Sequence, residues 1–216
     1  MIEFSKINLS FNEKEIGMEV YAWHELISNQ IRVHKTFYES HLLSYLLATY
    51  PRQKCIIDIG ANIGNHTIFF AEFMNAERIH AFEPHPMNFG LLEKNTLRYP
   101  TVERYKIALG CKQGKGKITT QSNNMGDVVV SEDENGEVEI SSIDAFKFSE
   151  VSMIKIDAEG WENRILEGSL DTLVKCKPVL IIEWKSIDFV YYGMSFLRQL
   201  RYVITAVLPD WNFILE

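Results

Sequence analysis

Cysteines and long apolar segments are scarce in this chain, and their scarcity excludes several classes of protein. Only three cysteines occur among 216 residues, and none belongs to a Cys-x-x-Cys pair. Such a set argues against a disulfide framework or a cysteine-rich zinc site, so we expect a cytoplasmic protein. No run approaches the roughly 18 apolar residues of a membrane span, and Met1–Lys6 lacks the features of a signal peptide. We therefore expect no membrane partner.

Basic residues are also few. Lys and Arg number 22 against 29 Asp and Glu, which gives a net charge of −7. This balance argues against nucleic acid as a partner, because a nucleic-acid-binding protein must neutralise phosphates. The length fits one domain of about 150 residues with an extension. We divide the chain into an N-terminal extension, residues 1–36, and a main domain, residues 37–216.

The main domain alternates short apolar runs with segments of helical length. Strands are predicted at 55–59, 78–82, 103–109, 153–157 and 179–183, with helices between them. One of these helices is expected to have Phe89, Leu92 and Leu97 as its inner face, and another is expected around residues 161–173. This alternation is typical of a parallel sheet with helices on both faces. Near the C-terminus, strands 202–208 and 211–215 flank a tight turn and must pair antiparallel. We predict an α/β fold with a doubly wound, mostly parallel seven-stranded sheet that ends in a C-terminal antiparallel hairpin.

Two regions depart from this alternation. Residues 1–22 have the pattern of a β-hairpin, so the extension is predicted to be a hairpin or lid followed by helix. Residues 110–146 form a polar excursion, in which Asn135-Gly136 predicts a second hairpin with a solvated acidic tip. Within the excursion, Asn123 and Asn124 either form a turn, which we favour, or reach the ligand cleft.

The segment Asp58–Gly64 joins the first strand of the main domain to a helix. Ligands of open α/β sheets bind at this edge. A dinucleotide fingerprint would need glycine at Asn62 and Asn65, and the chain has no Gly-Lys-Ser/Thr of a P-loop. Glu83 ends the next strand, where a carboxylate can accept hydrogen bonds from ribose hydroxyls. The pattern indicates a nucleoside ligand without a phosphate requirement, such as S-adenosylmethionine.

Taken together, these motifs resemble those of the FkbM family of S-adenosylmethionine-dependent methyltransferases, which have a class I, Rossmann-like fold. The resemblance covers about residues 37–185, and its most specific part is the glycine loop combined with Lys-x-Asp-x-Glu-Gly-x-Glu at 155–162. The residues that carry it are Ile57–Thr67, Ala81–Pro84, Ala108–Gly110, Ser142–Asp144, Ile154–Glu162, Leu166–Gly168, Pro178 and Glu183.

The resemblance implies methyl transfer from S-adenosylmethionine, leaving S-adenosylhomocysteine, to a hydroxyl of a sugar or small metabolite. It also implies a role for Asp157 in the cofactor site. Trp161 is a departure, because the family often has a small residue there; it either narrows the acceptor pocket or packs against the sheet. The implied cofactor contacts are Asp58, Gly60, Asn62, Gly64 and Thr67 at the methionine end, Glu83 at the ribose, and Pro84 and Ala108 beside the adenine.

Three acids mark the edge where the methyl group should point. Asp157 and Glu159 follow the fourth predicted strand, and Glu183 ends the fifth. Carboxylates on adjacent strand ends can share a proton, act as a base or hold a divalent cation. We predict these three as catalytic residues and assign no metal ligands, since a divalent cation is possible but not favoured. Glu162 is interpreted as a helix cap and Lys155 as the partner of a carboxylate.

Missing sequence motifs argue against other methylation chemistries. His66 and His85 are alternative bases that we do not favour. The segment Asp157–Gly160 lacks the Asn/Asp-Pro-Pro-aromatic pattern of exocyclic amino methylation, and no cysteine follows a proline as carbon-5 cytosine methylation would need. We therefore expect a small hydroxyl-bearing acceptor and no nucleic acid. Two alternatives stay open, namely a non-catalytic S-adenosylmethionine-binding or scaffold protein of the same fold, and aminopropyl transfer.

Overall fold

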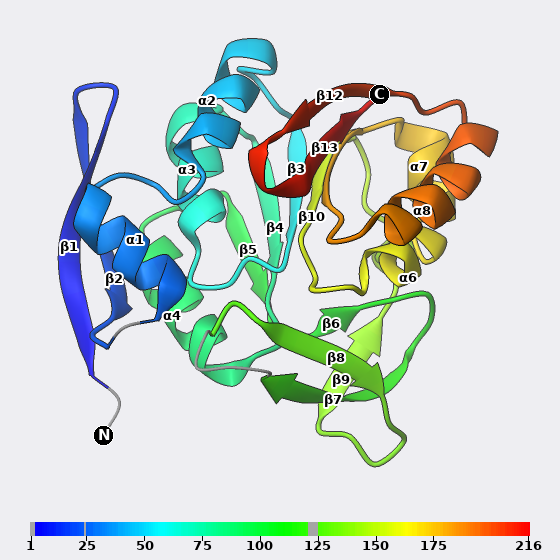
Figure 1. The fold of residues 1–216 in the computed structure, drawn as a ribbon, viewed down its shortest axis with the longest axis horizontal. Helices are drawn as coiled ribbons and strands as arrows, with labels where there is room; N and C mark the ends of the chain where they lie inside the picture. The colour runs from blue at the N-terminus through cyan, green and yellow to red at the C-terminus, as the bar shows by residue number, and fades with distance from the viewer. Residues whose placement is uncertain (1–2, 24, 121–124) are drawn as a thin grey trace.

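A computed structural model describes residues 3–23, 25–120 and 125–216. Asn123 and Asn124, for which a turn is predicted, lie outside the described residues. The main sheet has seven strands in the order β12-β13-β11-β10-β3-β4-β5 (Figure 1). The strands are β3 (Cys55–Ile59), β4 (Arg78–Phe82), β5 (Val102–Tyr105), β10 (Val151–Ile156), β11 (Val179–Glu183), β12 (Ile204–Leu208) and β13 (Asn212–Leu215).

This sheet is mixed. Strands β11, β10, β3, β4 and β5 are parallel neighbours. Strand β13 is antiparallel both to β11 and to β12, so it lies between its hairpin partner and the parallel strands. The predicted antiparallel pairing of the last two strands is confirmed. The carboxyl ends of β3, β4, β10 and β11 meet at one edge, which is where open α/β sheets bind ligands.

Helices cover both faces of the sheet (Figure 1). Local chemistry begins several of them; Pro86 stands in the first turn of α4, and the Ser186 hydroxyl accepts a hydrogen bond from the Phe189 N–H at the start of α8. On one side are α2 (Ser40–Thr49), α3 (Asn65–Phe73) and α4 (Pro86–Thr96), and on the other are α5 (Ile143–Phe146), α6 (Glu162–Glu167), α7 (Leu170–Cys176) and α8 (Ile187–Gln199).

Two details of the helices differ from prediction. The single helix expected around residues 161–173 is divided at Gly168, where a Cβ would lie 2.0 Å from the Gly110 carbonyl oxygen. The expected inner-face residue Leu97 is instead 78% exposed. It follows Leu92 by five positions, which is about 140° around a helix from the buried face.

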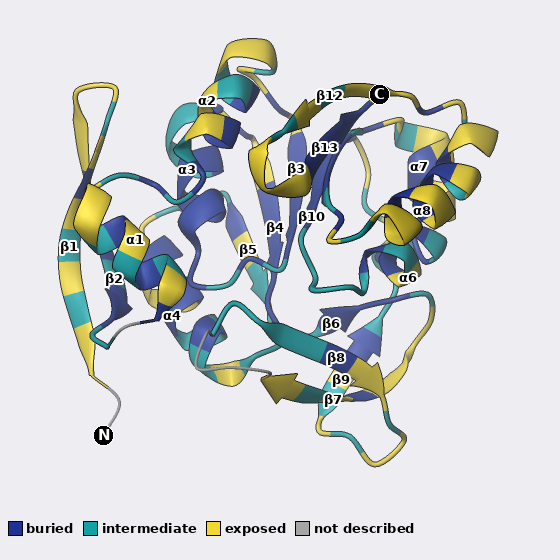
Figure 2. Cartoon of the chain, in the orientation of Figure 1, coloured by how far each residue is buried: buried dark blue, intermediate teal, exposed yellow. Residues whose placement is uncertain are grey.

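Strand β3 is buried along its whole length because both faces of the sheet are covered (Figure 2). Ile56 belongs to the apolar cluster beneath α2, α3 and α4, while the next residue, Ile57, belongs to the cluster beneath α6, α7 and α8. Successive strand residues point to opposite faces, so the short apolar runs of the sequence fill both halves of the core.

The N-terminal hairpin is confirmed. Strands β1 (Phe4–Phe11) and β2 (Lys14–Tyr21) pair antiparallel and lead to α1 (Leu26–His34). The Asn95 side chain of α4 accepts from the Glu19 N–H at 2.7 Å and donates to the Glu19 and Ile63 carbonyls, both at 2.8 Å. The same amide therefore ties the hairpin to the loop before α3.

The excursion folds differently from prediction. The strand expected at 103–109 bends after Tyr105, and β6 (Ala108–Leu109) joins a second sheet of order β6-β9-β7-β8. Strands β8 (Val128–Glu132) and β9 (Val138–Ser141) lie on opposite sides of β7 (Gly114–Thr120). The hairpin predicted at Asn135-Gly136 is therefore wrong. The turn instead crosses one end of β7. Turn residues could not predict this, because the pairing of β7 with β9 joins segments that are distant in the chain. Its acids are largely exposed, as expected.

Candidate active site

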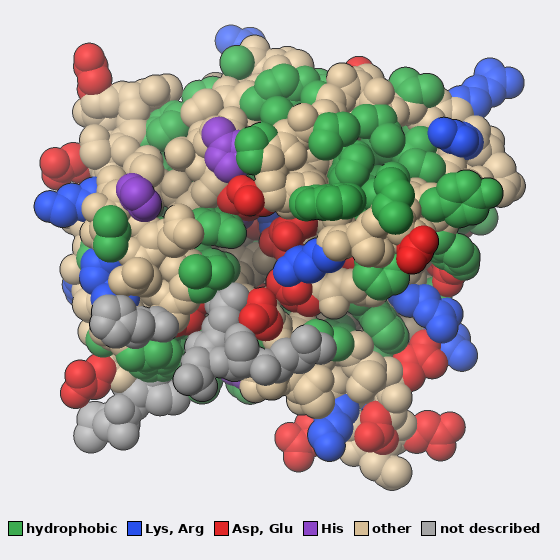
Figure 3. All heavy atoms as spheres, in the orientation of Figure 1, with side chains coloured by type: hydrophobic (Ala, Val, Ile, Leu, Met, Phe, Trp, Pro, Cys, Tyr) green, Lys and Arg blue, Asp and Glu red, His purple; other side chains and the backbone are tan. Residues whose placement is uncertain are grey.

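A pocket opens at the carboxyl ends of the central strands. Figure 3 shows acidic side chains gathered around a hollow in the middle of this face, with a basic side chain beside them. The residues that line it include Leu26, Ile27, Tyr38, Gly60, Asn62, Phe82, Glu83, Pro84, Ile107, Ala108, Asp127, Asp157, Glu159, Trp161, Glu183 and Lys185. The structure thus brings eight of the predicted site residues together.

The glycine loop is shaped by contacts that only glycine permits. Gly60 has φ 73°, and a Cβ there would lie 1.8 Å from the carbonyl oxygen of Asp157. The N–H groups of Gly60 and Ala61 both donate to the Phe82 carbonyl at 3.0 Å. Glycine therefore lets the ends of β3, β4 and β10 approach closely, and Asn62 is left facing the pocket.

Glu83 is buried at the end of β4 and lines the pocket. One carboxylate oxygen accepts a hydrogen bond from the Asn62 N–H and the other from the His85 N–H, both at 2.8 Å. Burial raises the pKa of Glu83 to about 7. These two backbone donors and the Asn88 side chain orient the carboxylate, which keeps acceptor capacity for a ligand. The predicted adenine neighbours Pro84 and Ala108 line the same pocket.

Three predicted cofactor residues lie behind the loop instead of in the pocket wall. Asp58 is fully buried and accepts a hydrogen bond of 2.5 Å from the Thr67 hydroxyl. Gly64 begins α3 with φ 91°, and a Cβ there would lie 3.1 Å from the Leu92 side chain. None of the three is among the pocket-lining residues. Asp58, Gly64 and Thr67 therefore support the glycine loop from its buried side and do not form part of the pocket wall.

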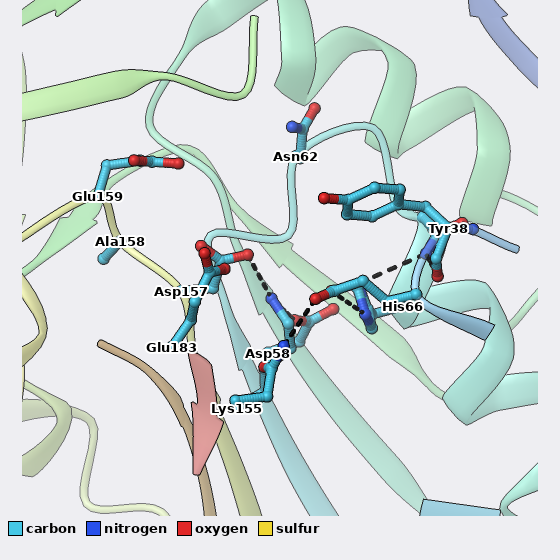
Figure 4. Close-up of polar contacts among 12 residues, drawn as sticks. Tyr38, Asp58, Asn62, His66, Lys155, Asp157, Ala158, Glu159 and Glu183 are labelled. Carbon is cyan, nitrogen blue, oxygen red and sulfur yellow. Dashed lines mark hydrogen bonds and ion pairs between the residues drawn. The ribbon is translucent and has the colours of Figure 1, made fainter. Parts of the chain in front are cut away.

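Asp157 and Glu183 lie next to one another at the ends of β10 and β11 (Figure 4), and their carboxyl groups share a hydrogen bond. Lys155 is 2% exposed, and its ammonium lies 3.1 Å from Asp157 Oδ2 and 3.9 Å from Asp58 Oδ1. Burial opposes its charge, but the carboxylates of Asp157 and Asp58 raise the pKa of Lys155 above its ordinary value. The predicted pairing of Lys155 with a carboxylate is confirmed.

The two carboxyl groups differ in proton affinity. Burial favours protonation of Asp157, but Lys155 and the hydrogen bond from Glu183 lower its pKa. Burial, followed by the negative charge of Asp157, raises the pKa of Glu183 far above its ordinary value. Both shifts favour a single proton on the pair, held by Glu183, with Asp157 accepting its hydrogen bond.

The third predicted catalytic acid, Glu159, lies farther along the pocket wall and forms an ion pair with Lys185 (Figure 4 shows Glu159 apart from the other two acids). Burial raises its pKa. The Lys185 ammonium is also 3.8 Å from Glu183. Nearby, Glu162 Oε1 accepts from the Gly160 N–H at 2.8 Å and the Ala158 N–H at 3.2 Å. Glu162 thus caps the loop before α6.

Sequence reasoning missed several pocket residues. Tyr38 lines the pocket, and Asn65 at the start of α3 holds its backbone by accepting from the Tyr38 N–H at 3.0 Å and donating to its carbonyl at 3.1 Å. No sequence motif marks the contact between Tyr38 and Asn65. His66, one of the two alternative bases, lies outside the pocket lining, with its Nε2 3.1 Å from Glu39. Lys185, two residues after Glu183, could have been found from its spacing alone.

Two findings concern metals and membranes. Among residues 3–23, 25–120 and 125–216, no three His, Cys, Asp or Glu side chains are grouped so as to hold a metal ion. Within the same described residues, every helix is too short or too polar to cross a membrane.

The family model described as the methyltransferase FkbM domain matches residues 58–204. The chain therefore belongs to the FkbM methyltransferase family, and the resemblance found in the sequence is confirmed.

Curated relatives agree with this assignment. The chain is 24% identical over 199 residues to Methyltransferase 1 of Beauveria bassiana. This alignment covers 77% of this chain and 79% of that protein. The chain is 26% identical over 150 residues to the hexuronic acid methyltransferase AglP of Haloferax volcanii, which covers 66% of this chain and 61% of AglP.

Solved structures share the fold. Methyltransferase FkbM from Methylobacillus flagellatus KT matches with a TM-score of 0.53 and 20% identity, over 76% of this chain and 43% of that one. The chain thus spans less than half the length of that structure. Precorrin-6y C5,15-methyltransferase from Geobacter metallireducens GS-15 matches with a TM-score of 0.52 and 15% identity, over 81% and 86% of the two chains. The fold is a class I methyltransferase-like α/β fold.

Proposed function

We propose that the protein is an S-adenosylmethionine-dependent methyltransferase that methylates a hydroxyl group on a sugar or small metabolite. The observation that carries the proposal is a single pocket with a buried, backbone-oriented carboxylate, Glu83, and a proton-sharing carboxyl pair, Asp157 and Glu183. Glu83 suits the hydroxyl groups of a ribose, and the Asp157–Glu183 pair suits the hydroxyl group of the acceptor.

The residues present fit the cofactor. Glu83 would take the ribose hydroxyls, since its carboxylate is held by two backbone N–H groups and the Asn88 side chain and keeps acceptor capacity for a further donor. An adenine ring would lie between Pro84 and the Ile107–Ala108 backbone, on an apolar wall that also includes Phe82. The absence of a phosphate-binding loop agrees with a nucleoside that carries no phosphate.

The acceptor side of the pocket must position a hydroxyl and take its proton. The bound cofactor would supply an activated methyl group. Asp157, held ionised by Lys155, and its neighbour Glu183 form the pair that can accept the hydroxyl proton, and before a ligand binds Glu183 donates a hydrogen bond that keeps Asp157 in place. Glu159 and Lys185 would orient the rest of the acceptor. Positioning of this kind is the main task of the protein in a transfer reaction.

The charge and the aromatic surface of the pocket support a small acceptor. Five acids line the pocket, and among its described lining residues Lys185 alone is basic; the acids are Glu83, Asp127, Asp157, Glu159 and Glu183. A pocket of this sign repels a polyanion, which argues against nucleic acid. Tyr38 and Trp161 add aromatic surface. The name of the relative AglP, a hexuronic acid methyltransferase, also supports a sugar acceptor.

The first test is calorimetric titration with S-adenosylmethionine and S-adenosylhomocysteine. We expect both to bind the wild type and Glu83→Ala to weaken both by about tenfold or more, because it removes charge-assisted hydrogen bonds. Glu134→Ala, at an exposed acid in the β8–β9 turn, is the control and should bind normally. Absence of binding by the wild-type protein would refute the proposal.

The second test identifies the chemistry. A library of hydroxyl-rich metabolites is screened for S-adenosylhomocysteine release, with and without a chelator. Turnover with a sugar or polyol supports O-methylation. Binding without turnover on any acceptor supports the non-catalytic alternative. Release of methylthioadenosine when decarboxylated S-adenosylmethionine is supplied as the donor supports aminopropyl transfer. Loss of turnover with the chelator would contradict the assignment of no metal ligands.

A further inference from the structure

The carboxyl pair at the floor of the pocket has an unusual position. Asp157 and Glu183 come from adjacent parallel strands, share a hydrogen bond, and are not sealed in the core. Their side chains are 25% and 19% exposed, and both line the pocket. A ligand in the pocket can therefore act directly on the proton that they share.

The charges around the pair come from several elements. Lys155 on β10 contacts Asp157 and the buried Asp58 of β3. Lys185 beyond β11 is engaged by Glu159 and lies 3.8 Å from Glu183. Other groups act over longer range: the Glu39–His66 pair at the starts of α2 and α3, and Asp127, whose negative charge acts on Glu159. The charge of Asp157 also raises the pKa values of Tyr38, Glu83 and Glu162.

These neighbours leave the site short of positive charge. Two ammonium groups, on Lys155 and Lys185, face the carboxyl groups of Asp58, Asp157, Glu159 and Glu183, so the four acids cannot all be balanced by lysines. The Glu39–His66 pair adds no net charge if it is ionised. A proton on the pair reduces the excess of negative charge, and a bound cation would do the same.

We propose that the Asp157–Glu183 pair exchanges its proton for the positive charge of the methyl donor: the pair holds one proton in the free protein and releases it to solvent when a sulfonium-bearing nucleoside binds. This inference rests on the proposed function, because it takes S-adenosylmethionine as the ligand. The exchange leaves the net charge of the site unchanged, since one positive charge replaces another. It leaves both carboxylates of the pair able to accept a proton when the methyl donor is in place.

The proton balance closes over a catalytic cycle. Binding of the donor frees one proton from the pair to solvent. When the acceptor oxygen gains the methyl group, its O–H bond breaks and the pair takes that proton, while the positive charge of the donor is neutralised by the electron pair of the broken sulfur–carbon bond. The site then has one proton on the pair and no sulfonium, which is its starting charge.

Calorimetry tests this without an acceptor. S-adenosylmethionine and S-adenosylhomocysteine are titrated into the protein in buffers with different ionisation enthalpies, with a chelator present. The two ligands share the ribose, so the titration of Glu83 contributes to both. We expect about one more proton to be released with S-adenosylmethionine, and its affinity relative to S-adenosylhomocysteine to rise by up to about tenfold per pH unit between about pH 6 and pH 8.

Two variants locate the source of the proton. Glu183→Gln keeps a hydrogen-bond donor for Asp157 but has no proton to release, so we expect the difference between the ligands to shrink by about one proton. Glu159→Gln changes another acid of the same wall and acts on the pair only through Lys185, so it should shrink the difference less than Glu183→Gln does. Binding of S-adenosylhomocysteine shows that each variant is folded.

Each outcome decides a separate point. Equal proton release by both ligands, or a difference that Glu183→Gln leaves intact, refutes the proton exchange. A difference that disappears in Glu159→Gln but persists in Glu183→Gln also refutes it, because the proton then comes from the other acid. If neither ligand binds, the proposed function fails, and the inference fails with it.

Discussion

The buried ammonium of Lys155 offers the sharpest test of the electrostatics described above. In the variant Lys155→Met the aliphatic stem is kept and only the charge is lost. The ammonium lies within 3.9 Å of two carboxylates, and one of them, Asp58, is fully buried with the Thr67 hydroxyl as its other close partner. Removal of one partner of a buried ion pair leaves an uncompensated charge, which costs about 3–5 kcal/mol. That is a large part of the 5–15 kcal/mol that stabilises a typical domain.

The pH dependence of this cost has a definite sign. The pKa of Asp157 is lowered in the folded protein, so its ionised form stabilises the fold above its ordinary pKa, and this stabilisation is lost as the pH falls through the lowered value. In Lys155→Met that benefit is absent, so we expect the cost to be largest at neutral pH and to shrink below about pH 5. The raised pKa of Lys155 means that the wild type loses its contribution only in strongly alkaline solution.

Urea unfolding followed by tryptophan fluorescence measures the cost, because Trp184 is buried in the core beneath α8. Lys175→Met is the matched control. Lys175 is 74% exposed and lies 3.9 Å from Asp171 one turn earlier on α7, and an exposed pair of this kind contributes about 0.5 kcal/mol or less. The reasoning is refuted if the two variants cost the same at pH 7, or if the cost of Lys155→Met does not change between about pH 7 and pH 4.

Two further predictions concern the glycine loop. Gly60→Ala places a Cβ 1.8 Å from the Asp157 carbonyl oxygen at positive φ, so it should lower the free energy of unfolding by at least about 2 kcal/mol and abolish nucleoside binding. The control Gly90→Ala, in the interior of α4, meets nothing within 4 Å and should raise the free energy of unfolding by about 0.5–1 kcal/mol. Thermal unfolding of the two variants checks both effects. Thr67→Val removes the hydrogen bond to Asp58 and should cost about 1–3 kcal/mol in chemical denaturation, and a cost below that range would show that Asp58 finds another partner.

Much of the site could be predicted because its residues follow strands that the sequence marks clearly. Glu83, Asp157 and Glu183 each stand at the end of a short apolar run, and parallel strands bring their carboxyl ends to one edge. Gly60 was predictable from its place after a strand, and its contact with the Asp157 carbonyl explains the requirement for glycine. The roles assigned to these residues toward a ligand remain predictions.

Other residues could not be placed from local pattern. Asp58 in β3 and Thr67 in α3 stand on either side of the conspicuous loop that contains Gly60, yet they pair with one another behind it. Tyr38 reaches the pocket because Asn65, distant in sequence, holds its backbone. The turn at 135–136 has the composition of a hairpin, but β7 lies between the two strands that it connects.

The sequence by itself determined the order of strands and helices, the glycine loop and the family, because periodicity and short motifs are local properties of the chain. Only the tertiary structure decided which acids share a proton and which residues line the pocket. Proton affinity depends on distances between segments far apart in the chain: Lys155 beneath Asp157, Glu183 beside it, and Lys185 turned toward Glu159. The net charge of −7 is a property of composition, whereas the excess of acid in this pocket is a property of the fold.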